Sequence, residues 1–308
     1  MQSLPTNNRD PVIDDKQKYG VTFVTDQDVR VYTDTRSKSM ISLEGFLAIF
    51  EDIKFICQMI GELLKNLFRS KETKNRYNHV NGDASDKNQV FAIPGLGDPG
   101  IWGHMLKNKL GKETDVCVIQ NKKNGNQPVK DTYTSILNLV KKYCDANPGK
   151  PIVLTGVSLG GRLAHKIEVA LRESHPSTPV LVYAMAPAFA SKFATDMDKH
   201  APCLTKAVLH GSLIKCFKVG SDSTDTLITS INAPITDTIA PRTIVDVKAS
   251  NDSMINDGNA FGVINNQEKL TYIRKEAHSC SHLGVISVAM DDLANDISHY
   301  FPPRPADS

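Results

Sequence analysis

The sequence lacks an excess of charge of either sign. Lys and Arg number 36 against 34 Asp and Glu in 308 residues, which gives a net charge of +2. A strong basic excess is the electrostatic footprint of proteins that bind nucleic acid, so no nucleic-acid partner is expected. With 40% hydrophobic and 23% charged residues, the composition is that of a globular chain rather than a disordered or collagen-like one.

Targeting and membrane-spanning patterns are also lacking. The opening residues have no basic stretch followed by an apolar run, so no secretory signal peptide is predicted. The longest apolar stretch, residues 43–68, is interrupted by charged residues such as Glu51, Asp52 and Lys54, which argues against a spanning helix. The six cysteines contain no Cys-x-x-Cys pair, so reduced thiols are expected. These absences favour a cytoplasmic location, with export by a route independent of a signal peptide left open.

The first 88 residues differ in character from the rest. Two β-rich runs, Val21–Val24 and Val29–Tyr32, predict a hairpin. A helical pattern over residues 42–68 has apolar positions around about 220° of its circumference, and such a face needs a covering partner. Its polar strip lacks the Lys and Arg excess of a helix lying on lipid, so contact with protein is preferred to contact with a membrane. Residues 69–88 predict a polar surface linker.

From residue 89 onward, short apolar runs alternate with amphipathic ones. The strand-like runs are 89–93, 115–119, 151–155, 180–184, 243–247 and 271–274, and the helical patterns are 131–145, 159–173, 266–270 and 283–300. This alternation predicts an α/β domain over residues 89–308, with a mostly parallel central sheet and helices on both faces. Residues 187–240 break the rhythm, and we expect them to form a cap insertion above the sheet.

The most informative segment is a serine between two glycines. An apolar strand-like run leads into Gly156-Val157-Ser158-Leu159-Gly160, and a helical pattern follows at once. A serine at a sharp strand-to-helix turn needs small residues two positions before and after it, because the backbone is crowded there. The N-terminus of the following helix offers free N–H groups to a developing oxyanion. The alternative is a glycine-rich turn with no catalytic role; the lysine of a phosphate-binding P-loop is absent.

Because of this serine turn, the segment of residues 89–301 resembles the α/β-hydrolase superfamily, most closely its lipase and esterase members. The resemblance implies an oxyanion loop after an upstream strand, where Pro94-Gly95-Leu96-Gly97 stands in this sequence. The family usually has a histidine in place of Pro94, but the donor itself is a backbone N–H. By analogy, the two donors are the N–H groups of Leu96 and Leu159. The first 88 residues lie outside the resemblance.

The resemblance also implies the chain order serine, acid, histidine. Asp252, which follows the strand-like run 243–247, is the expected acid. Its rivals are Asp225, Asp237, Asp246 and Asp257. The expected triad is therefore Ser158, Asp252 and a downstream histidine.

Two histidines compete for the role of base. His282 lies at the family's usual distance before the end of the final helix and is preferred to His278. His278, Cys280 and His282 together also suggest a metal site, but ligands four residues apart need a helix, and no second cluster completes four ligands. No metal and no cofactor are therefore expected.

The resemblance implies a serine hydrolase that cleaves a carboxylic ester through an acyl-enzyme on Ser158, with an ester or lipid-like acyl substrate. Three alternatives stay open: an acyl-protein thioesterase, an acyltransferase with the same triad, and a non-enzymatic interaction module on the same fold. Apolar residues in 187–240, such as Phe189 and Leu213, either line an acyl-binding cap or pack the cap onto the sheet. The oligomeric state stays open.

Overall fold

The computed structural model describes residues 87–301 and a short strand at 21–23. Within 87–301 the exceptions are residues 99, 111, 122–125, 190–198, 201–210, 218–221, 251, 253–263 and 279. The predicted helix 42–68, the second arm of the predicted hairpin and nearly all of the predicted linker lie outside the described residues.

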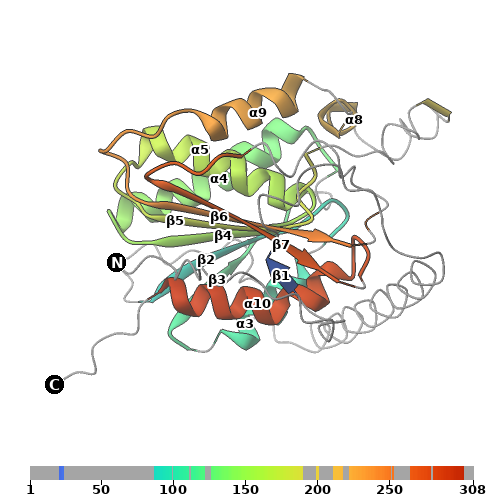
Figure 1. The fold of residues 1–308 in the computed structure, drawn as a ribbon, viewed down its shortest axis with the longest axis horizontal. Helices are drawn as coiled ribbons and strands as arrows, with labels where there is room; N and C mark the ends of the chain where they lie inside the picture. The colour runs from blue at the N-terminus through green and yellow to red at the C-terminus, as the bar shows by residue number, and fades with distance from the viewer. Residues whose placement is uncertain are drawn as a thin grey trace.

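A seven-stranded sheet forms the centre of the described structure, in the order β1-β7-β6-β5-β4-β2-β3 (Figure 1). In chain order the elements are β1 (Val21–Phe23), β2 (Asn88–Ile93), α3 (Ile101–Lys109), β3 (Thr114–Val118), α4 (Val129–Ala146), β4 (Ile152–Val157), α5 (Leu159–Ser174), β5 (Val180–Met185), α8 (Gly211–Phe217), α9 (Asp222–Asn232), β6 (Arg242–Ala249), β7 (Leu270–Ala277) and α10 (Val285–Tyr300). Strands β2 to β7 run parallel, so their carboxyl ends meet at one edge.

Each strand-like run of the sequence coincides with one of the six parallel strands. All six residues of β4 and all six of β5 are buried, because helices cover both faces of the sheet. Strands buried on both faces consist of continuous apolar runs rather than alternating ones, as Pro151-Ile152-Val153-Leu154 illustrates. The prediction of a mostly parallel, two-sided sheet is confirmed.

The helices form a layer on each side of the sheet. In Figure 1, α4 and α5 lie above it and α3 and α10 below it. The chain runs outward from β2 to β3, then crosses back over β2 to reach β4. Because such crossovers are right-handed, this reversal places α3 and α4 on opposite faces. Helices were predicted at 131–145, 159–173 and 283–300, and α4, α5 and α10 lie there; α3 was not predicted.

The predicted helix at 266–270 is wrong. The backbone there makes a tight turn in which Gln267 and Leu270 exchange N–H···O bonds, and β7 begins at Leu270. Polar side chains hold this turn: the Asn266 amide oxygen accepts the Tyr272 N–H at 2.6 Å, and Gln267 Oε1 accepts the Ile235 N–H at 3.0 Å. Such side-chain bonds compete with helix formation.

The strand β1 joins the sheet from the other end of the chain. It pairs antiparallel with β7, and the register places Val21 opposite Ala277 and Phe23 opposite Lys275. The first arm of the predicted hairpin is therefore a strand of the main sheet.

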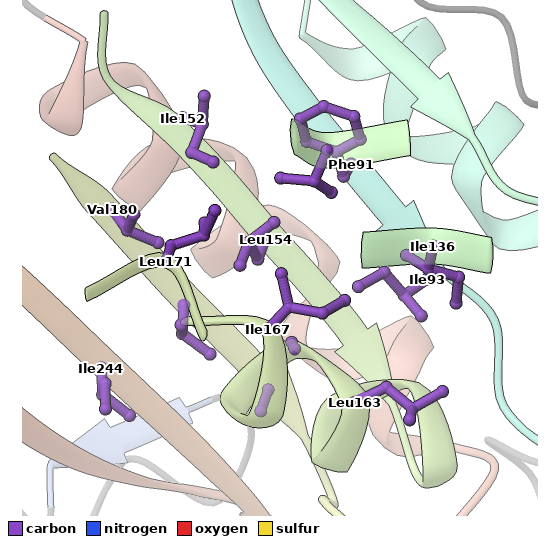
Figure 2. Close-up of a cluster of buried hydrophobic side chains, with 14 of the residues drawn as sticks. Phe91, Ile93, Ile136, Ile152, Leu154, Leu163, Ile167, Leu171, Val180 and Ile244 are labelled. Carbon is purple, nitrogen blue, oxygen red and sulfur yellow. The ribbon is translucent and has the colours of Figure 1, made fainter. Parts of the chain in front are cut away.

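Two apolar clusters fill the space between the sheet and its helix layers. Figure 2 shows the cluster on the α5 side, where Leu163, Ile167 and Leu171 of α5 pack near Leu154 of β4 and Val180 of β5. The cluster on the other face joins α10 and α3 to the sheet, with Trp102 and Leu293 fully buried. Within the described residues, no helix is long and apolar enough to cross a membrane.

The described part of the 187–240 insertion packs on the α4 and α5 layer. Ser212 at the start of α8 accepts the Val129 N–H at 3.1 Å, and the Arg162 guanidinium donates to Phe189 O at 2.7 Å and to Thr224 Oγ1 at 3.0 Å. Phe189 and Leu213 are completely buried in the core. For these two residues, the packing alternative accounts for their apolar character.

Candidate active site

Ser158 lies at the sharp turn between β4 and α5 with a strained backbone. Its φ of 53° and ψ of −119° fall outside the regions that L-residues favour. Outliers of this kind persist only where the surrounding structure fixes them, and they gather at functional sites. Two hydrogen bonds do so here: the Ser158 N–H donates to Met185 O at 2.9 Å, and the Ser158 carbonyl accepts the Ala188 N–H at 3.0 Å.

The flanking glycines explain why this sequence can make the turn. A Cβ on Gly156 would lie 2.3 Å from the carbonyl carbon of Gly160. A Cβ on Gly160 would lie 2.1 Å from the carbonyl oxygen of Ile93. Contacts this short are impossible, so any larger residue would push β4, α5 and the end of β2 apart. The spacing seen in the sequence is thus a packing requirement of the serine turn.

The predicted oxyanion loop lies directly against this turn. A Cβ on Gly95 would lie 3.2 Å from the Val157 carbonyl oxygen and 3.5 Å from Ser158 Cβ. The next residue in the loop is the half-buried Leu96, and Leu159 occupies the first position of α5. The two backbone N–H groups expected to stabilise an oxyanion therefore belong to the loop that packs against the Ser158 turn and to the residue that follows Ser158.

Asp252 and His282 form a hydrogen-bonded pair. His282 Nδ1 lies 2.7 Å from Asp252 Oδ2, and the two side chains are only 7% and 2% exposed. Asp252 follows β6, where its N–H donates to Ala249 O, and His282 lies in the turn that leads into α10. The Asp252 carboxylate fixes the proton on Nδ1, which leaves Nε2 as the acceptor nitrogen.

The strand register brings these segments to the same edge of the sheet. Val157 of β4 pairs with Met185 of β5, Met185 with Val247 of β6, and Val247 with Lys275 of β7. Ser158 comes one residue after this row, and Asp252 and His282 come a few residues beyond it. Ligands bind at the carboxyl edge in open α/β sheets, which is the edge these three residues share.

The alternatives for acid and base lie elsewhere. Asp246 is fully buried within β6, where it bonds His165 and Tyr272. Asp225 and Asp237 are exposed on and after α9, and Asp257 lies outside the described residues. His278 occupies the turn after β7, and His282 lies within hydrogen-bond distance of Asp252. In the described part of the chain, no group of three or more His, Cys, Asp or Glu could hold a metal ion.

One residue of the site region was missed in the sequence. Asp98 follows the glycine-rich loop, and its Oδ1 accepts the Gly100 N–H at 2.7 Å just before α3. Burial raises the pKa of Asp98 to about 6, although the N–H groups of Gly100, Ile101 and Gly95 favour its charged form; the Trp102 indole lies nearby, but its Nε1 makes no hydrogen bond among the described residues. The signal was present in the sequence, since Asp before Pro-Gly is typical of a side chain that closes a turn on its own backbone.

Comparison with known proteins shows which family and which solved structures the chain is similar to. A family model for the alpha/beta hydrolase fold matches residues 124–281. No similar protein was found among the curated sequences. Among solved structures, lipase B from Aspergillus fumigatus is similar with a TM-score of 0.50 and 14% identity, over 71% of this chain and 54% of the lipase. This chain therefore spans about half the length of that lipase.

Two further structures are similar at lower scores. A peroxisomal alpha/beta-hydrolase from Saccharomyces cerevisiae has a TM-score of 0.49 and 12% identity, over 74% of this chain and 82% of that chain. The type II thioesterase BorB from the borrelidin biosynthetic cluster has a TM-score of 0.46 and 12% identity, over 72% and 97%. The family model covers about half of the chain, and the chain belongs to the family of proteins with the alpha/beta hydrolase fold.

Proposed function

We propose that this protein is a serine hydrolase that cleaves a carboxylic ester through an acyl-enzyme on Ser158. One observation carries the proposal: a serine in a strained strand-to-helix turn shares a sheet edge with a hydrogen-bonded Asp252–His282 pair. Either feature alone has a structural explanation. A serine turn alone is compatible with a simple βα connection, and a His–Asp pair alone is compatible with a structural ion pair.

The Asp252–His282 pair supplies what the serine lacks. Free serine is a poor nucleophile at neutral pH and needs a base next to it. In the proposed mechanism, His282 Nε2 takes the Ser158 hydroxyl proton as Oγ attacks the ester carbonyl carbon. Asp252 holds the Nδ1–H tautomer and stabilises the imidazolium that forms. His282 then donates its new proton to the departing alcohol, which leaves an acyl group on Ser158.

Backbone N–H groups complete the chemistry. The tetrahedral intermediate carries a negative oxygen, which the Leu96 and Leu159 N–H groups stabilise by about 3 kcal/mol per donor. Water then attacks the acyl-enzyme with His282 as base, the acid is released, and Ser158 regains its proton. The overall reaction consumes one ester and one water and yields one acid and one alcohol, without a metal or an organic cofactor.

An apolar acyl group suits the surroundings of His282. Among the described residues, Leu283 is the large apolar side chain that stays exposed, at 45%, and it follows His282 directly. We expect turnover of p-nitrophenyl esters to rise from acetyl to octanoyl, by at most about 0.8 kcal/mol for each CH₂ that becomes buried. Leu283→Ser should flatten this series. A series that falls with chain length in the unaltered protein would indicate a small polar acyl group instead.

The proposal is tested with a fluorophosphonate probe, which forms a covalent bond with an activated serine. The full-length protein should be labelled once, at Ser158, and Ser158→Ala should abolish labelling. Ser174→Ala, at the exposed end of α5, is the matched control and should label fully. Labelling that survives Ser158→Ala would disprove the assignment of the nucleophile. A folded protein that takes up no probe would favour the non-enzymatic interaction module.

A further inference from the structure

Asp98 closes the predicted oxyanion loop on itself. Its backbone N–H donates to Gly95 O at 3.4 Å, and its Oδ1 accepts the Gly100 N–H at 2.7 Å. The loop thus has its first residue, Gly95, and its last, Gly100, tied to the same aspartate. Gly97 and Gly100 have φ values of 79° and 83°, which only glycine adopts readily. Because glycine also adopts many other conformations, hydrogen bonds are needed to hold the loop in this shape.

The position of this loop is coupled to the position of Ser158. Gly95 packs against Val157 and Ser158, with no room for even a methyl group against the Val157 carbonyl unless the neighbouring backbone shifts. At its other end, the loop passes through Gly100 into α3, which is anchored by the fully buried Ile101 and Trp102. Asp98 sits between these two fixed points, next to a helix N-terminus that favours a negative side chain.

The part of Asp98 that the loop uses is its Oδ1 acceptor and not its charge. Among the described residues, its Oδ2 is buried with no hydrogen-bond partner, and so is the Trp102 Nε1. A buried carboxylate with an unsatisfied oxygen is costly. An asparagine would keep the Oδ1 acceptor for Gly100 without a buried charge. The carboxylate is therefore not the most stabilising choice at this position.

We propose that Asp98 is a positioning residue that holds the Gly95–Gly100 loop so that the Leu96 N–H stays directed at the substrate's carbonyl oxygen. This inference rests on the function proposed above, because it gives the loop its role in stabilising the oxyanion. In this role Asp98 acts on the reaction through the backbone of the loop. What it supplies is an acceptor at a fixed point, so a neutral acceptor of the same shape should replace it.

The test compares Asp98→Ala and Asp98→Asn in the full-length protein. Asp98→Ala removes the acceptor, and kcat for a p-nitrophenyl ester should fall roughly 10- to 100-fold while KM stays nearly unchanged, because a misplaced donor weakens transition-state binding. Asp98→Asn should restore kcat to within about threefold of the original. Asp131→Asn, an exposed aspartate on α4, is the matched control and should change neither constant.

Fluorophosphonate labelling separates a positioning role from a loss of folded protein. Each kcat is divided by the fraction of molecules labelled after prolonged reaction, so that unfolded molecules do not count. Under the proposal, Asp98→Ala labels to completion but at a rate lowered in proportion to kcat. The proposal is overturned if kcat per labelled site is unchanged in Asp98→Ala, or if Asp98→Asn is as slow as Asp98→Ala. If the unaltered protein is not labelled at all, the proposed function fails first, and this inference falls with it.

Discussion

Among the residues that the structure describes, two buried His–Asp pairs of nearly equal length lie in very different places. His282 and Asp252 approach to 2.7 Å at the carboxyl edge of the sheet, and His165 and Asp246 approach to 2.8 Å between α5 and β6. The second pair is completely buried, and Asp246 also accepts the Tyr272 hydroxyl at 3.0 Å. Distance alone therefore does not identify a reactive pair.

Access and ring orientation distinguish the two pairs. Asp252 bonds Nδ1 of its histidine, which leaves Nε2 at the far end of the ring, whereas Asp246 bonds Nε2 of His165. The remaining nitrogen of His165 is buried without a hydrogen-bond partner among the described residues, and the ring packs 5.0 Å from that of Phe189. Nothing from solution reaches that nitrogen. The core pair ties α5 to β6 and, through Tyr272, to β7, which suits a structural role.

The largest expected effect is the loss of activity when the His282–Asp252 pair at the sheet edge is broken. His282→Ala and Asp252→Asn should each lower kcat for an ester by about 10³- to 10⁴-fold, because the base or its orienting partner is lost. Thermal unfolding should show that both variants stay folded. His278→Ala is the control and should keep most of the activity. If His278→Ala is the damaging change and His282→Ala is mild, the assignment of the base is wrong.

For the His165–Asp246 pair in the core, we expect a loss of stability rather than a loss of activity. His165→Ala leaves the Asp246 carboxylate buried without its partner, and we expect a loss of about 3–5 kcal/mol in the free energy of unfolding. His175 offers a matched control at the surface, since its pair with Asp145 has the same geometry at 2.9 Å but a 74% exposed carboxylate. His175→Ala should cost less than about 1 kcal/mol.

Activity per labelled serine completes the core-pair experiment. It should be unchanged in His165→Ala, because His165 takes no part in the proposed chemistry. A fall in activity as large as that of His282→Ala, in folded protein, would remove the distinction between the two pairs.

Asp98, the carboxylate of the predicted oxyanion loop, should make the stability of the protein depend on pH. Its pKa of about 6 in the folded protein lies above the ordinary value of 3.8. The folded state therefore binds the proton more tightly, and this contribution to stability is present below about pH 4 and is lost as the pH rises through 6. The shift corresponds to at most about 3 kcal/mol.

Denaturant unfolding of Asp98→Asn at several pH values checks this sign. The introduced amide cannot ionise, so Asp98→Asn should be more stable than the original at pH 7, and the difference should shrink towards pH 4. Asp131→Asn provides the reference for an exposed aspartate. A difference that does not change with pH would show that the Asp98 carboxyl does not titrate as its burial implies.

Much of this fold could be predicted from the sequence, because its strands are buried on both faces. Continuous runs such as Val180–Met185 have few other interpretations, and the glycines around Ser158 follow from a steric requirement. The error at 266–270 arose because side-chain bonds from Asn266 and Gln267 to distant backbone groups fix a turn there. The pattern around α3 is weak, because the helix has only nine residues, one of its few buried positions is Gly103, and the residue before it, Gly100, is in a left-handed conformation.

The candidate site was harder to predict from the sequence than the fold. Chain order and turn chemistry pointed to Ser158, Asp252 and His282. The sequence alone, however, does not show which of His278 and His282 contacts Asp252. The bond between Asp252 and His282 joins positions thirty residues apart, and its existence depends on how two loops pack. Asp98 differs, because the N–H groups of Gly95, Gly100 and Ile101 that act on it lie within three residues of it, so the Asp-Pro-Gly turn could have been predicted from the sequence.

The pairing of β1 with β7 has a consequence for how the chain is made. Val21 meets Ala277, so β1 leaves the ribosome about 250 residues before its partner strand. Contacts between such distant residues form late and slow folding. Until then, β1 is unpaired and the sheet ends at β6, whose open edge is a template for pairing with other chains. Nascent chains that stall before residue 270 should therefore be more prone to aggregation than the finished protein.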